Sequence, residues 1–256
     1  MPSRTILITG ATSGIGEALA RLCIAQGYTV GATGRRIRRL EALKGELGER
    51  LHIRQMDLTD FEDAKTGLAG LAEEMGGMDI VVLNAGVSNL QDRDSLDAEQ
   101  HVIDVNVSGF VQLANTAYEY FKGRKHGHIV GISSVASLLG YGQSAAYNAS
   151  KAFISTYMQG YRQKAKHTDS DIVVTDIRPG FVESEMTGGA QRRMFWIAPA
   201  DKAARQILTA IEKRRNYAYV TKRWRIAAWA VKLTPDWIID RIGFIALPEK
   251  HQIKNK

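Results

Sequence analysis

Residues 5–16, TILITGATSGIG, decide the fold: the apolar run Thr5–Thr9 is followed at once by the glycine-rich stretch Gly10–Gly16. The run reads as a buried strand, and an amphipathic helix is expected from about Ile15 to Gln26. Because glycine has no Cβ, the backbone of such a turn can approach a pyrophosphate, which the N–H groups of a helix N-terminus also attract. The stretch therefore predicts a dinucleotide-binding turn, with an ordinary tight strand–helix turn as the alternative.

The rest of the chain continues this alternation of strands and helices. Further strands are expected at residues 29–33, 51–56, 79–84, 128–133, 171–177 and 217–220, and further helices at 37–47, 61–75, 100–121, 147–166 and 199–214. The strands are apolar on both faces, which is typical of a buried parallel sheet. The sequence thus predicts an α/β fold: a single-domain, Rossmann-type, doubly wound parallel sheet with helices on both faces and a C-terminal helical tail. We expect the domain to span residues 1–221, and the tail, residues 222–256, to pack on it or on a partner subunit.

Composition favours an ordinary soluble enzyme-sized domain. Hydrophobic residues make up 45% of the 256 and charged residues 24%, far from disordered or fibrous compositions. Cys23 is the only cysteine, so no intrachain disulfide can form and a reducing compartment is favoured. Neither a signal peptide nor a run of ~18–20 apolar residues is visible. We therefore expect a cytoplasmic location.

The spacing of Gly10, Gly14 and Gly16 resembles the short-chain dehydrogenase/reductase family. Further marks of that family follow in order between Thr9 and about Met186: Asp57-Leu58, Asn84-Ala85-Gly86, Asn106, Ser134, Tyr147-x-x-x-Lys151 and Pro179-Gly180. Together these motifs form a specific pattern. The resemblance implies an oxidoreductase that transfers hydride between a nicotinamide and a carbonyl or alcohol carbon.

Tyr147 and Lys151 lie four residues apart, so on a helix their side chains rise from one face. A free phenol has a pKa near ~10, and a nearby ammonium favours the phenolate, so Lys151 should bring Tyr147 closer to working pH. Taken alone, such a pair is more often a solvated helix face. The Ser134 hydroxyl can hydrogen-bond the same substrate oxygen; Ser133 is its rival, and the family's spacing selects Ser134. By resemblance, Lys151 also binds the nicotinamide ribose and Asn106 holds a water for proton relay.

The end of the second strand bears on the choice of cofactor. An NAD-preferring site usually has an acidic residue there, but this chain has Gly34 followed by Arg35 and Arg36. Guanidinium groups suit a 2′-phosphate, so we predict NADP(H) rather than NAD(H). The alternative is that these arginines, with Arg38 and Arg39, only decorate an exposed helix.

The predicted cofactor-binding residues come from the glycine turn, the two arginines and the family motifs. By resemblance, Asp57 accepts the adenine amino group, Leu58 supplies a backbone contact, and Val182 and Ser184 face the carboxamide, although the family more often has threonine at the latter position. No metal site is predicted. The full cofactor set is Gly10, Thr12, Ser13, Gly14, Ile15, Gly16, Arg35, Arg36, Asp57, Leu58, Asn84, Ala85, Gly86, Tyr147, Lys151, Pro179, Gly180, Val182 and Ser184.

Apolar residues surround the expected substrate position and favour a mainly apolar ketone, aldehyde or secondary alcohol. An equally good interpretation is that they only pack the loop. These residues are Leu138, Leu139, Tyr141, Met186, Met194, Phe195 and Trp196.

The C-terminal tail carries the basic character of the chain. Residues 201–256 hold 13 of the 34 Lys and Arg and 5 of the 27 Asp and Glu. Within 222–247, Trp224, Trp229 and Trp237 alternate with basic and aliphatic residues, which suits a helix on a membrane surface or on a partner subunit. Pro235 should divide the segment into two short helices. We favour packing of the tail on a subunit or on the substrate site over peripheral membrane contact. We expect a homodimer or homotetramer. The tail shows no nucleic-acid motif.

Two other functions compete with NADP-dependent carbonyl chemistry. One is a redox-sensing module that binds NADP without turnover, and the intact catalytic positions argue against it. The other is a membrane-peripheral, lipid-modifying reductase with the same chemistry and the tail as its anchor.

Overall fold

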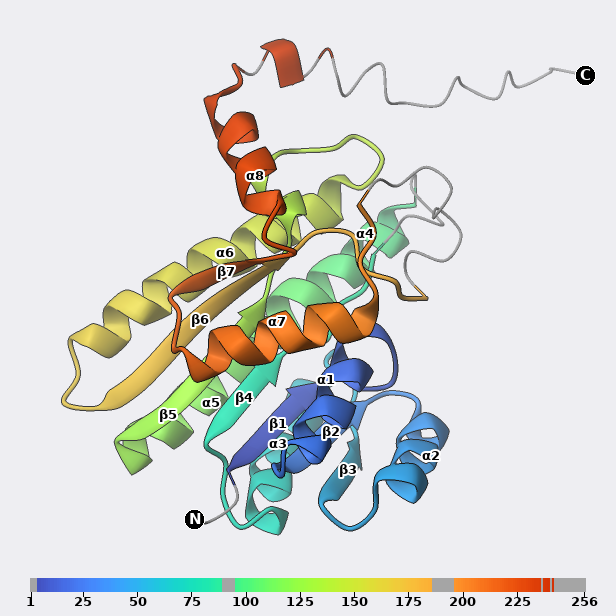
Figure 1. The fold of residues 1–256 in the computed structure, drawn as a ribbon, viewed down its shortest axis with the longest axis vertical. Coiled ribbons are helices and arrows are strands. Elements are labelled where there is room, and N and C mark those ends of the chain that lie inside the picture. Colours follow the sequence, from blue (N-terminus) through green and yellow to red (C-terminus); the bar gives the residue numbers. More distant parts are fainter. Residues whose placement is uncertain (1–3, 89–94, 186–195, 236, 240, 242–256) are drawn as a thin grey trace, which may run out of the picture.

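The computed structural model of the protein describes residues 4–88, 95–185, 196–235, 237–239 and 241. Its centre is one seven-stranded sheet in the order β3-β2-β1-β4-β5-β6-β7, and every neighbouring pair is parallel (Figure 1). The chain builds outward from β1 in one direction and from β4 in the other. The predicted doubly wound parallel sheet is therefore confirmed.

The elements alternate along the chain as the sequence predicts. The strands are β1 (Thr5–Thr9), β2 (Thr29–Gly34), β3 (Leu51–Gln55), β4 (Ile80–Leu83), β5 (His126–Ile132), β6 (Asp171–Pro179) and β7 (Tyr217–Val220). The helices are α1 (Gly14–Ala25), α2 (Ile37–Leu47), α3 (Phe61–Glu74), α4 (Leu96–Ile103), α5 (Phe110–Arg124), α6 (Ala145–Lys166), α7 (Ala200–Glu212) and α8 (Trp224–Leu233). A π-helical segment, Asp104–Gly109, joins α4 to α5, and a short 3₁₀ helix, Val135–Leu138, follows β5.

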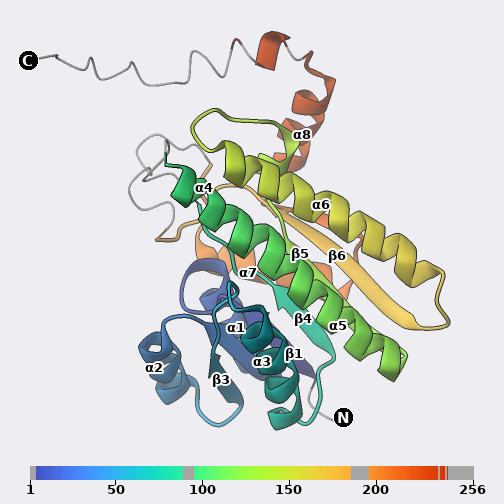
Figure 2. The ribbon, with the colours of Figure 1, turned by 180° about the vertical axis from the view of Figure 1, so that it is seen from behind.

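Helices cover both faces of the sheet. Figure 1 shows α1, α2 and α7 on one face, and Figure 2, from behind, shows α3, α5 and α6 on the other. Side chains of a strand alternate between its two faces, and β1 follows this rule: Ile6 and Ile8 join the core under α1 and α7, whereas Leu7 joins the core under α3 and α5. All three are fully buried. The apolar run that opens the sequence is therefore the middle of both cores.

The helix expected over residues 100–121 is interrupted in the structure. Residues Asp104–Gly109 form a π-helical stretch between α4 and α5. The buried Asn106 side chain lies in this wider turn and both accepts from and donates to the backbone of Val87, at 2.8 and 2.9 Å. Such bulges recur at functional sites. The periodicity of the sequence does not reveal this one, because the apolar spacing is nearly unbroken.

Candidate active site

The glycine turn lies at the carboxyl end of β1, next to β4, where the direction of winding reverses. Gly10 has a φ of +69°, and a Cβ there would lie 2.7 Å from the Cα of Ala85. A Cβ on Gly16 would lie 2.3 Å from the carbonyl oxygen of Gly10. Only glycine allows this close approach of backbone to backbone. The turn leads directly into α1, whose first helical residues include Gly14 and Ile15.

Asn84 and Thr9 hold the turn against the end of β4. The Asn84 amide donates to the carbonyl oxygens of Thr9 and Gly10 at 2.9 and 3.1 Å. The Thr9 hydroxyl accepts from the backbone N–H groups of Asn84 and Ala85 at 3.0 and 3.1 Å. Asn84, a predicted cofactor residue, thus uses its side chain to hold the shape of the turn, and its backbone lies at the end of β4.

Ser134, Tyr147 and Lys151 meet beyond the end of β5. Ser134 is the N-terminal cap of the short 3₁₀ helix, and its hydroxyl accepts from the Ala136 N–H at 3.0 Å. The Ser134 hydroxyl also hydrogen-bonds that of Tyr147, on α6. One turn later on α6, the Lys151 ammonium lies 5.7 Å from the centre of the Tyr147 ring and donates to the Ile132 carbonyl oxygen at 3.1 Å. The three side chains that the sequence singled out therefore share one site.

Ser133 faces away from this site. Its hydroxyl donates to the Asp176 carboxylate at 2.5 Å and to the Ile177 carbonyl oxygen at 3.0 Å. The fully buried Asp176 also accepts from Ser155 at 2.8 Å and forms an ion pair with Arg178 at 2.7 Å. Ser133 belongs to this buried polar network behind Lys151, which leaves Ser134 as the serine that meets Tyr147.

Burial governs both titratable groups of the site. It raises the pKa of Tyr147, and the hydrogen bond from Ser134 offsets part of this rise. It lowers the pKa of Lys151 to about 8, against a smaller opposing effect of the Asp176 carboxylate. The expected lowering of the phenol pKa by Lys151 does not prevail here, because loss of solvent disfavours the phenolate more. Tyr147 is therefore protonated at neutral pH, the state of a proton donor.

Asn106 approaches Lys151 from the π-helical segment. A Cβ on Gly86 would lie 3.2 Å from both the Asn106 Oδ1 and the Lys151 Nζ, so both atoms border that glycine. The Asn106 amide also donates to the Ser150 hydroxyl at 3.0 Å. The absence of a side chain at Gly86 thus leaves room for both the amide oxygen and the ammonium.

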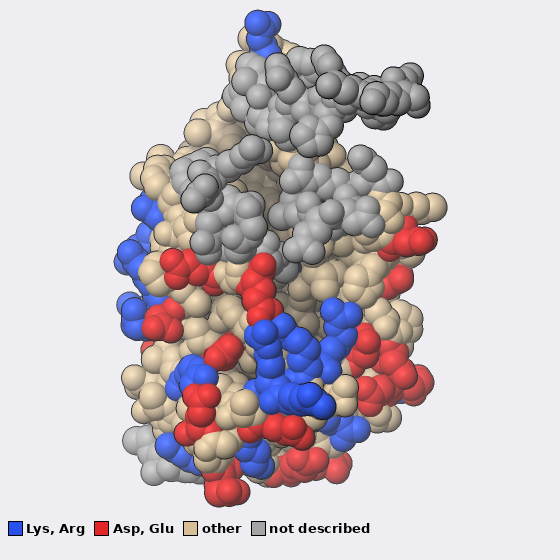
Figure 3. Space-filling view, turned by 90° about the vertical axis from the view of Figure 1, so that its right-hand side faces the viewer, with Lys and Arg blue, Asp and Glu red and all other residues tan. Residues whose placement is uncertain are grey.

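Arg36 reaches from the end of β2 over the glycine turn. Its guanidinium donates to the Thr12 hydroxyl at 2.8 Å and to the Ser13 hydroxyl at 2.9 Å. A Cβ at Gly34 would lie 2.7 Å from the Thr12 side chain, which would have to shift to admit the acidic residue of an NAD site. Figure 3 shows basic side chains gathered on the side of the molecule where α2 lies.

The carboxylate of Glu185 lies between two arginines at the start of α2. Glu185 pairs with Arg36 at 2.5 Å and also with Arg39. Both arginines lower the pKa of Glu185 by hydrogen bonding, Arg36 the more strongly. The pairing shows that two guanidinium groups from the start of α2 can converge on one anion.

The remaining predicted cofactor residues line the same edge of the sheet. Asp57 accepts from the Thr59 N–H and hydroxyl at 3.0 and 2.9 Å, and Leu58 is buried. Burial alone would raise the pKa of Asp57, but the two bonds from Thr59 and the charge of Arg35 bring it below its usual value.

The segment after β6 closes the edge near the glycine turn. Pro179 ends β6, Val182 is buried and bridges to Ala198, and a Cβ on Gly14 would lie 3.1 Å from the Ser184 Cβ. A Cβ on Gly180 would collide with Trp224 of α8, at 1.9 Å. The segment 179–184 therefore reaches from the first residue of α8, at Gly180, to the glycine turn, at Ser184.

An aromatic cluster adjoins the site. The rings of Phe181 and Trp196 both meet Trp224 edge to face, with centroids 5.5 Å apart in each pair. Val135 and Leu138, just after Ser134, pack against the same group. We call these five residues the apolar wall. Of the predicted substrate-loop residues, Met186, Met194 and Phe195 lie outside the described residues.

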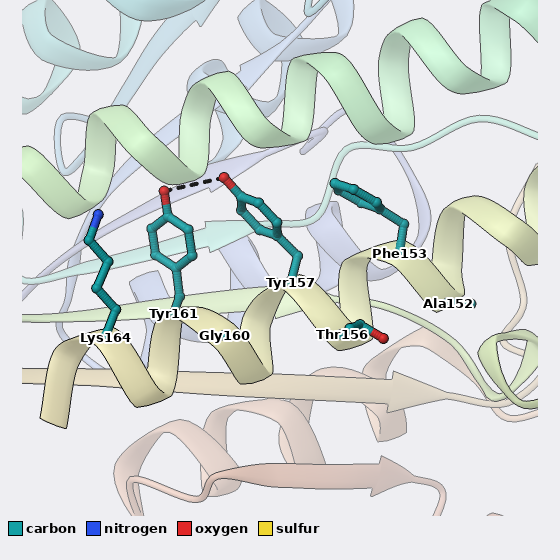
Figure 4. Close-up of a pocket in the computed structure, with 7 residues that line it drawn as sticks. All are labelled: Ala152, Phe153, Thr156, Tyr157, Gly160, Tyr161 and Lys164. Atoms are coloured by element: carbon teal, nitrogen blue, oxygen red, sulfur yellow. Dashed lines mark hydrogen bonds between the residues drawn. The ribbon is translucent and has the colours of Figure 1, made fainter.

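A separate hollow of about 680 Å³ lies on the outer face of α6, away from the catalytic side chains. Figure 4 shows Phe153, Tyr157 and Tyr161 in a row along that face, with a hydrogen bond of 3.2 Å between the two tyrosine hydroxyls. Lys164 lies at its end, 5.2 Å from the Tyr161 ring centre. The hollow is bordered by aromatic rings rather than by reacting groups.

The sequence analysis missed two contributors to the site. Asp176 is a carboxylate in the interior of a mostly apolar strand, and that exception was a readable signal, because buried carboxylates need partners. Glu185 follows Ser184, the last predicted site residue, and no local pattern could show that it pairs with Arg36, 149 residues away.

Comparison with known proteins agrees with this geometry. The sequence profile of the short chain dehydrogenases matches residues 4–194. The chain belongs to the short chain dehydrogenase family. An "Uncharacterized oxidoreductase" of Myxococcus xanthus is 40% identical over 232 residues, which is 89% of this chain and 90% of that one. The "NADP-dependent 3-hydroxy acid dehydrogenase YdfG" of Escherichia coli is 38% identical over 180 residues, 69% of this chain and 72% of that one.

A solved short chain dehydrogenase also superposes well. The closed form of serine dehydrogenase complexed with NADP⁺ has a TM-score of 0.74 and 30% identity, covering 84% of this chain and 93% of that one. This protein is therefore an oxidoreductase of a family that binds a nicotinamide cofactor. Across the described ranges, no helix has the length and apolar character needed to cross a membrane.

Proposed function

We propose that this short chain dehydrogenase transfers hydride between NADP(H) and a mainly apolar ketone, aldehyde or secondary alcohol, with Tyr147 as the general acid and base. The observation that carries the proposal is the meeting of Ser134, Tyr147 and Lys151 beyond β5, on the strand-end edge that also holds the glycine turn. Ligands of open α/β sheets bind at this edge.

The residues have separate roles in the reduction direction. When bound, NADPH would supply a hydride to the carbonyl carbon. Tyr147 gives its phenolic proton to the carbonyl oxygen, and the Ser134 hydroxyl hydrogen-bonds that oxygen as negative charge develops on it. Lys151 stabilises the phenolate that forms. We also assign to Lys151 the binding of the nicotinamide ribose hydroxyls. To Asn106 we assign the binding of a water molecule through which the proton returns to Tyr147. Oxidation of an alcohol runs the same steps backwards.

The anion-binding arginines support NADP over NAD. Arg36 and Arg39 converge on the carboxylate of Glu185, which stands in for a phosphate, and Gly34 supplies no acid to bind the ribose. A guanidinium matches phosphate geometry in a bidentate way. The names of relatives that use NADP agree with this choice.

Arg36→Ser should weaken NADPH far more than NADH. The loss of a charged hydrogen bond, ~1.5–3 kcal/mol, corresponds to about 10- to 100-fold in the Kd of NADPH. Titration calorimetry with NADPH, NADH and 2′,5′-ADP measures this. Arg38→Ser, an exposed arginine of the same helix turn, is the matched control. Glu185→Gln should tighten NADPH and 2′,5′-ADP but not NADH, since it removes a competing carboxylate. Equal losses for both dinucleotides in Arg36→Ser would refute the NADP assignment.

The apolar wall supports the substrate class. Val135 and Leu138 follow Ser134 directly, so an apolar group attached to the reacting carbonyl would lie beside them. Apolar contacts of this kind orient a substrate while a few polar groups fix its reacting atom. A panel of carbonyls and alcohols, followed by NADPH absorbance, tests this class, and turnover of highly charged carbonyls alone would refute it.

We also propose that the protein is a homodimer or homotetramer of the cytoplasm, with residues 1–221 as its catalytic domain. The hollow along α6 is where we place one subunit contact, because its row of aromatic rings would be covered by a second copy. The buried, unpaired Cys23 suits a reducing compartment.

A further inference from the structure

Helix α8 is apolar on two opposite faces. Its inner face, Trp224 and Ala228, is buried against the body of the protein. Ile226, Trp229 and Leu233 recur at helical spacing on the opposite side, with 76%, 67% and 76% of their surfaces exposed. A helix that only covers a soluble domain turns polar residues outward. We call these three residues the outer face of α8, and nothing among the described residues covers it.

The outer face is flanked by positive charge. Residues 221–235 hold four Lys or Arg and no Asp or Glu. Arg225 and Lys232 lie between the two apolar faces on α8 itself, and both are exposed, as is Lys222 just before the helix. Trp237, 68% exposed, follows beyond Pro235, where residues 237–239 are helical again. Tryptophan and basic residues beside an apolar stripe are the composition of helices that lie in a lipid headgroup region.

The position of α8 allows contact with a flat surface. Figures 1 and 2 both show it at one end of the molecule, standing out beyond the sheet and its two helical layers. Its inner face is fixed by Trp224, which packs on Gly180, Phe181 and Trp196. The helix is therefore held with its outer face turned away from the protein rather than free to fold back.

We propose that the outer face of α8 is a docking surface for an anionic lipid bilayer. Charge distinguishes this occupant from a second copy of the chain. A two-fold interface places the same patch against itself, so Lys222, Arg225 and Lys232 would meet the same cations with no acidic residue of this segment between them. An anionic headgroup layer satisfies these charges, while Ile226, Trp229 and Leu233 enter the acyl boundary. The proposal does not depend on which cofactor or substrate the enzyme uses.

Vesicle sedimentation with the full chain tests the proposal. The wild type is mixed with vesicles of phosphatidylcholine alone and of phosphatidylcholine with 30% phosphatidylglycerol (about one headgroup in three, enough for a clear negative surface potential). The variants are Ile226→Ser/Trp229→Ser/Leu233→Ser and, separately, Arg225→Glu/Lys232→Glu. Leu96→Ser on α4 is the matched control, because Leu96 is 78% exposed and far from α8 in sequence. Melting temperature and molar mass are measured for every variant.

We expect the wild type and Leu96→Ser to bind the anionic vesicles at least tenfold more strongly than the neutral ones. Salt at 0.5 M should weaken that binding, because it is about five times the ionic strength at which surface charges are already screened beyond ~10 Å. Each α8 variant should lose tenfold or more of this binding with unchanged melting temperature and mass. Wild type that stays in the supernatant overturns the proposal, as does binding that the triple variant retains. A fall in molar mass in the triple variant, without vesicle binding by the wild type, would show that a second copy covers the face.

Discussion

Tyr147→Phe is expected to lower kcat for NADPH-dependent carbonyl reduction by about 10²–10⁴-fold, the range of a lost general acid. Burial raises the pKa of the Tyr147 phenol, which also hydrogen-bonds Ser134, so in the proposed role the phenol holds the proton that it gives to a carbonyl oxygen. Phenylalanine keeps the ring and its packing but has no proton to give. The Kd of NADPH should stay nearly constant, because the proposed partner of the hydroxyl is the substrate oxygen. Steady-state kinetics and a fluorescence titration with NADPH measure the two quantities.

Tyr157→Phe is the matched control for this substitution. Tyr157 lies on the same helix but in the outer hollow, with its hydroxyl near that of Tyr161. It should leave kcat within a factor of about two, as surface changes away from a site usually do. A Tyr147→Phe enzyme that keeps wild-type turnover would remove Tyr147 from the chemistry. Loss of NADPH binding together with turnover would make it a cofactor-binding residue instead.

Lys151→Met is expected to make the protein more stable and at least a hundredfold less active. Lys151 is 4% exposed, and burial lowers its pKa from 10.5 to about 8. At neutral pH the buried ammonium therefore costs on the order of 3 kcal/mol of folding free energy. Loss of its bond to the Ile132 carbonyl should offset about 1 kcal/mol. We expect a net gain of about 1–2 kcal/mol, measured by denaturant unfolding at pH 7.

The pH dependence of this gain in stability distinguishes an effect of the buried ammonium charge from an effect of side-chain packing. The pKa of Lys151 is lower in the folded protein than in the unfolded chain, so the unfolded chain binds more protons between pH 8 and 10.5. The stability of the wild type should therefore rise relative to Lys151→Met across that window, and the gap seen below pH 8 should narrow. In the wild type, carbonyl reduction should fall as the ammonium is lost above about pH 8. A less stable variant whose gap does not change with pH would contradict this account.

The order of elements and the pair of apolar cores follow from local patterns in the sequence. Thr5–Thr9 alternates its side chains between two cores, and the apolar run alone is enough to predict a strand buried on both faces. Tyr147 and Lys151 are brought together by helical spacing, which is also local. Ser134 lies beside Tyr147 and Lys151 only because β5 pairs in parallel with β4 and β6. The family motif predicted this placement of Ser134, which periodicity could not.

What the sequence does not reveal is set by contacts between distant segments. The π-helical turn at Asn106 depends on Val87, and the Glu185 pair depends on Arg36, 149 residues away. The raised pKa of Tyr147 likewise depends on how much solvent the fold removes, which spacing does not report. The outward face of α8 could be suspected from its tryptophans, but only the packing of Trp224 on Gly180 decides which side faces out.

The central claim, hydride transfer between NADP and a carbonyl carbon at this site, is tested most directly by isotope transfer. The protein is incubated with NADPH that carries deuterium at both C4 positions of the nicotinamide and with apolar ketones and aldehydes, and the products are analysed by mass spectrometry. We expect alcohols with one deuterium on the carbinol carbon, formed by the wild type about 10²–10⁴-fold faster than by Tyr147→Phe. Tight NADPH binding with no labelled alcohol from any carbonyl would contradict it and would describe a binding module instead of an enzyme.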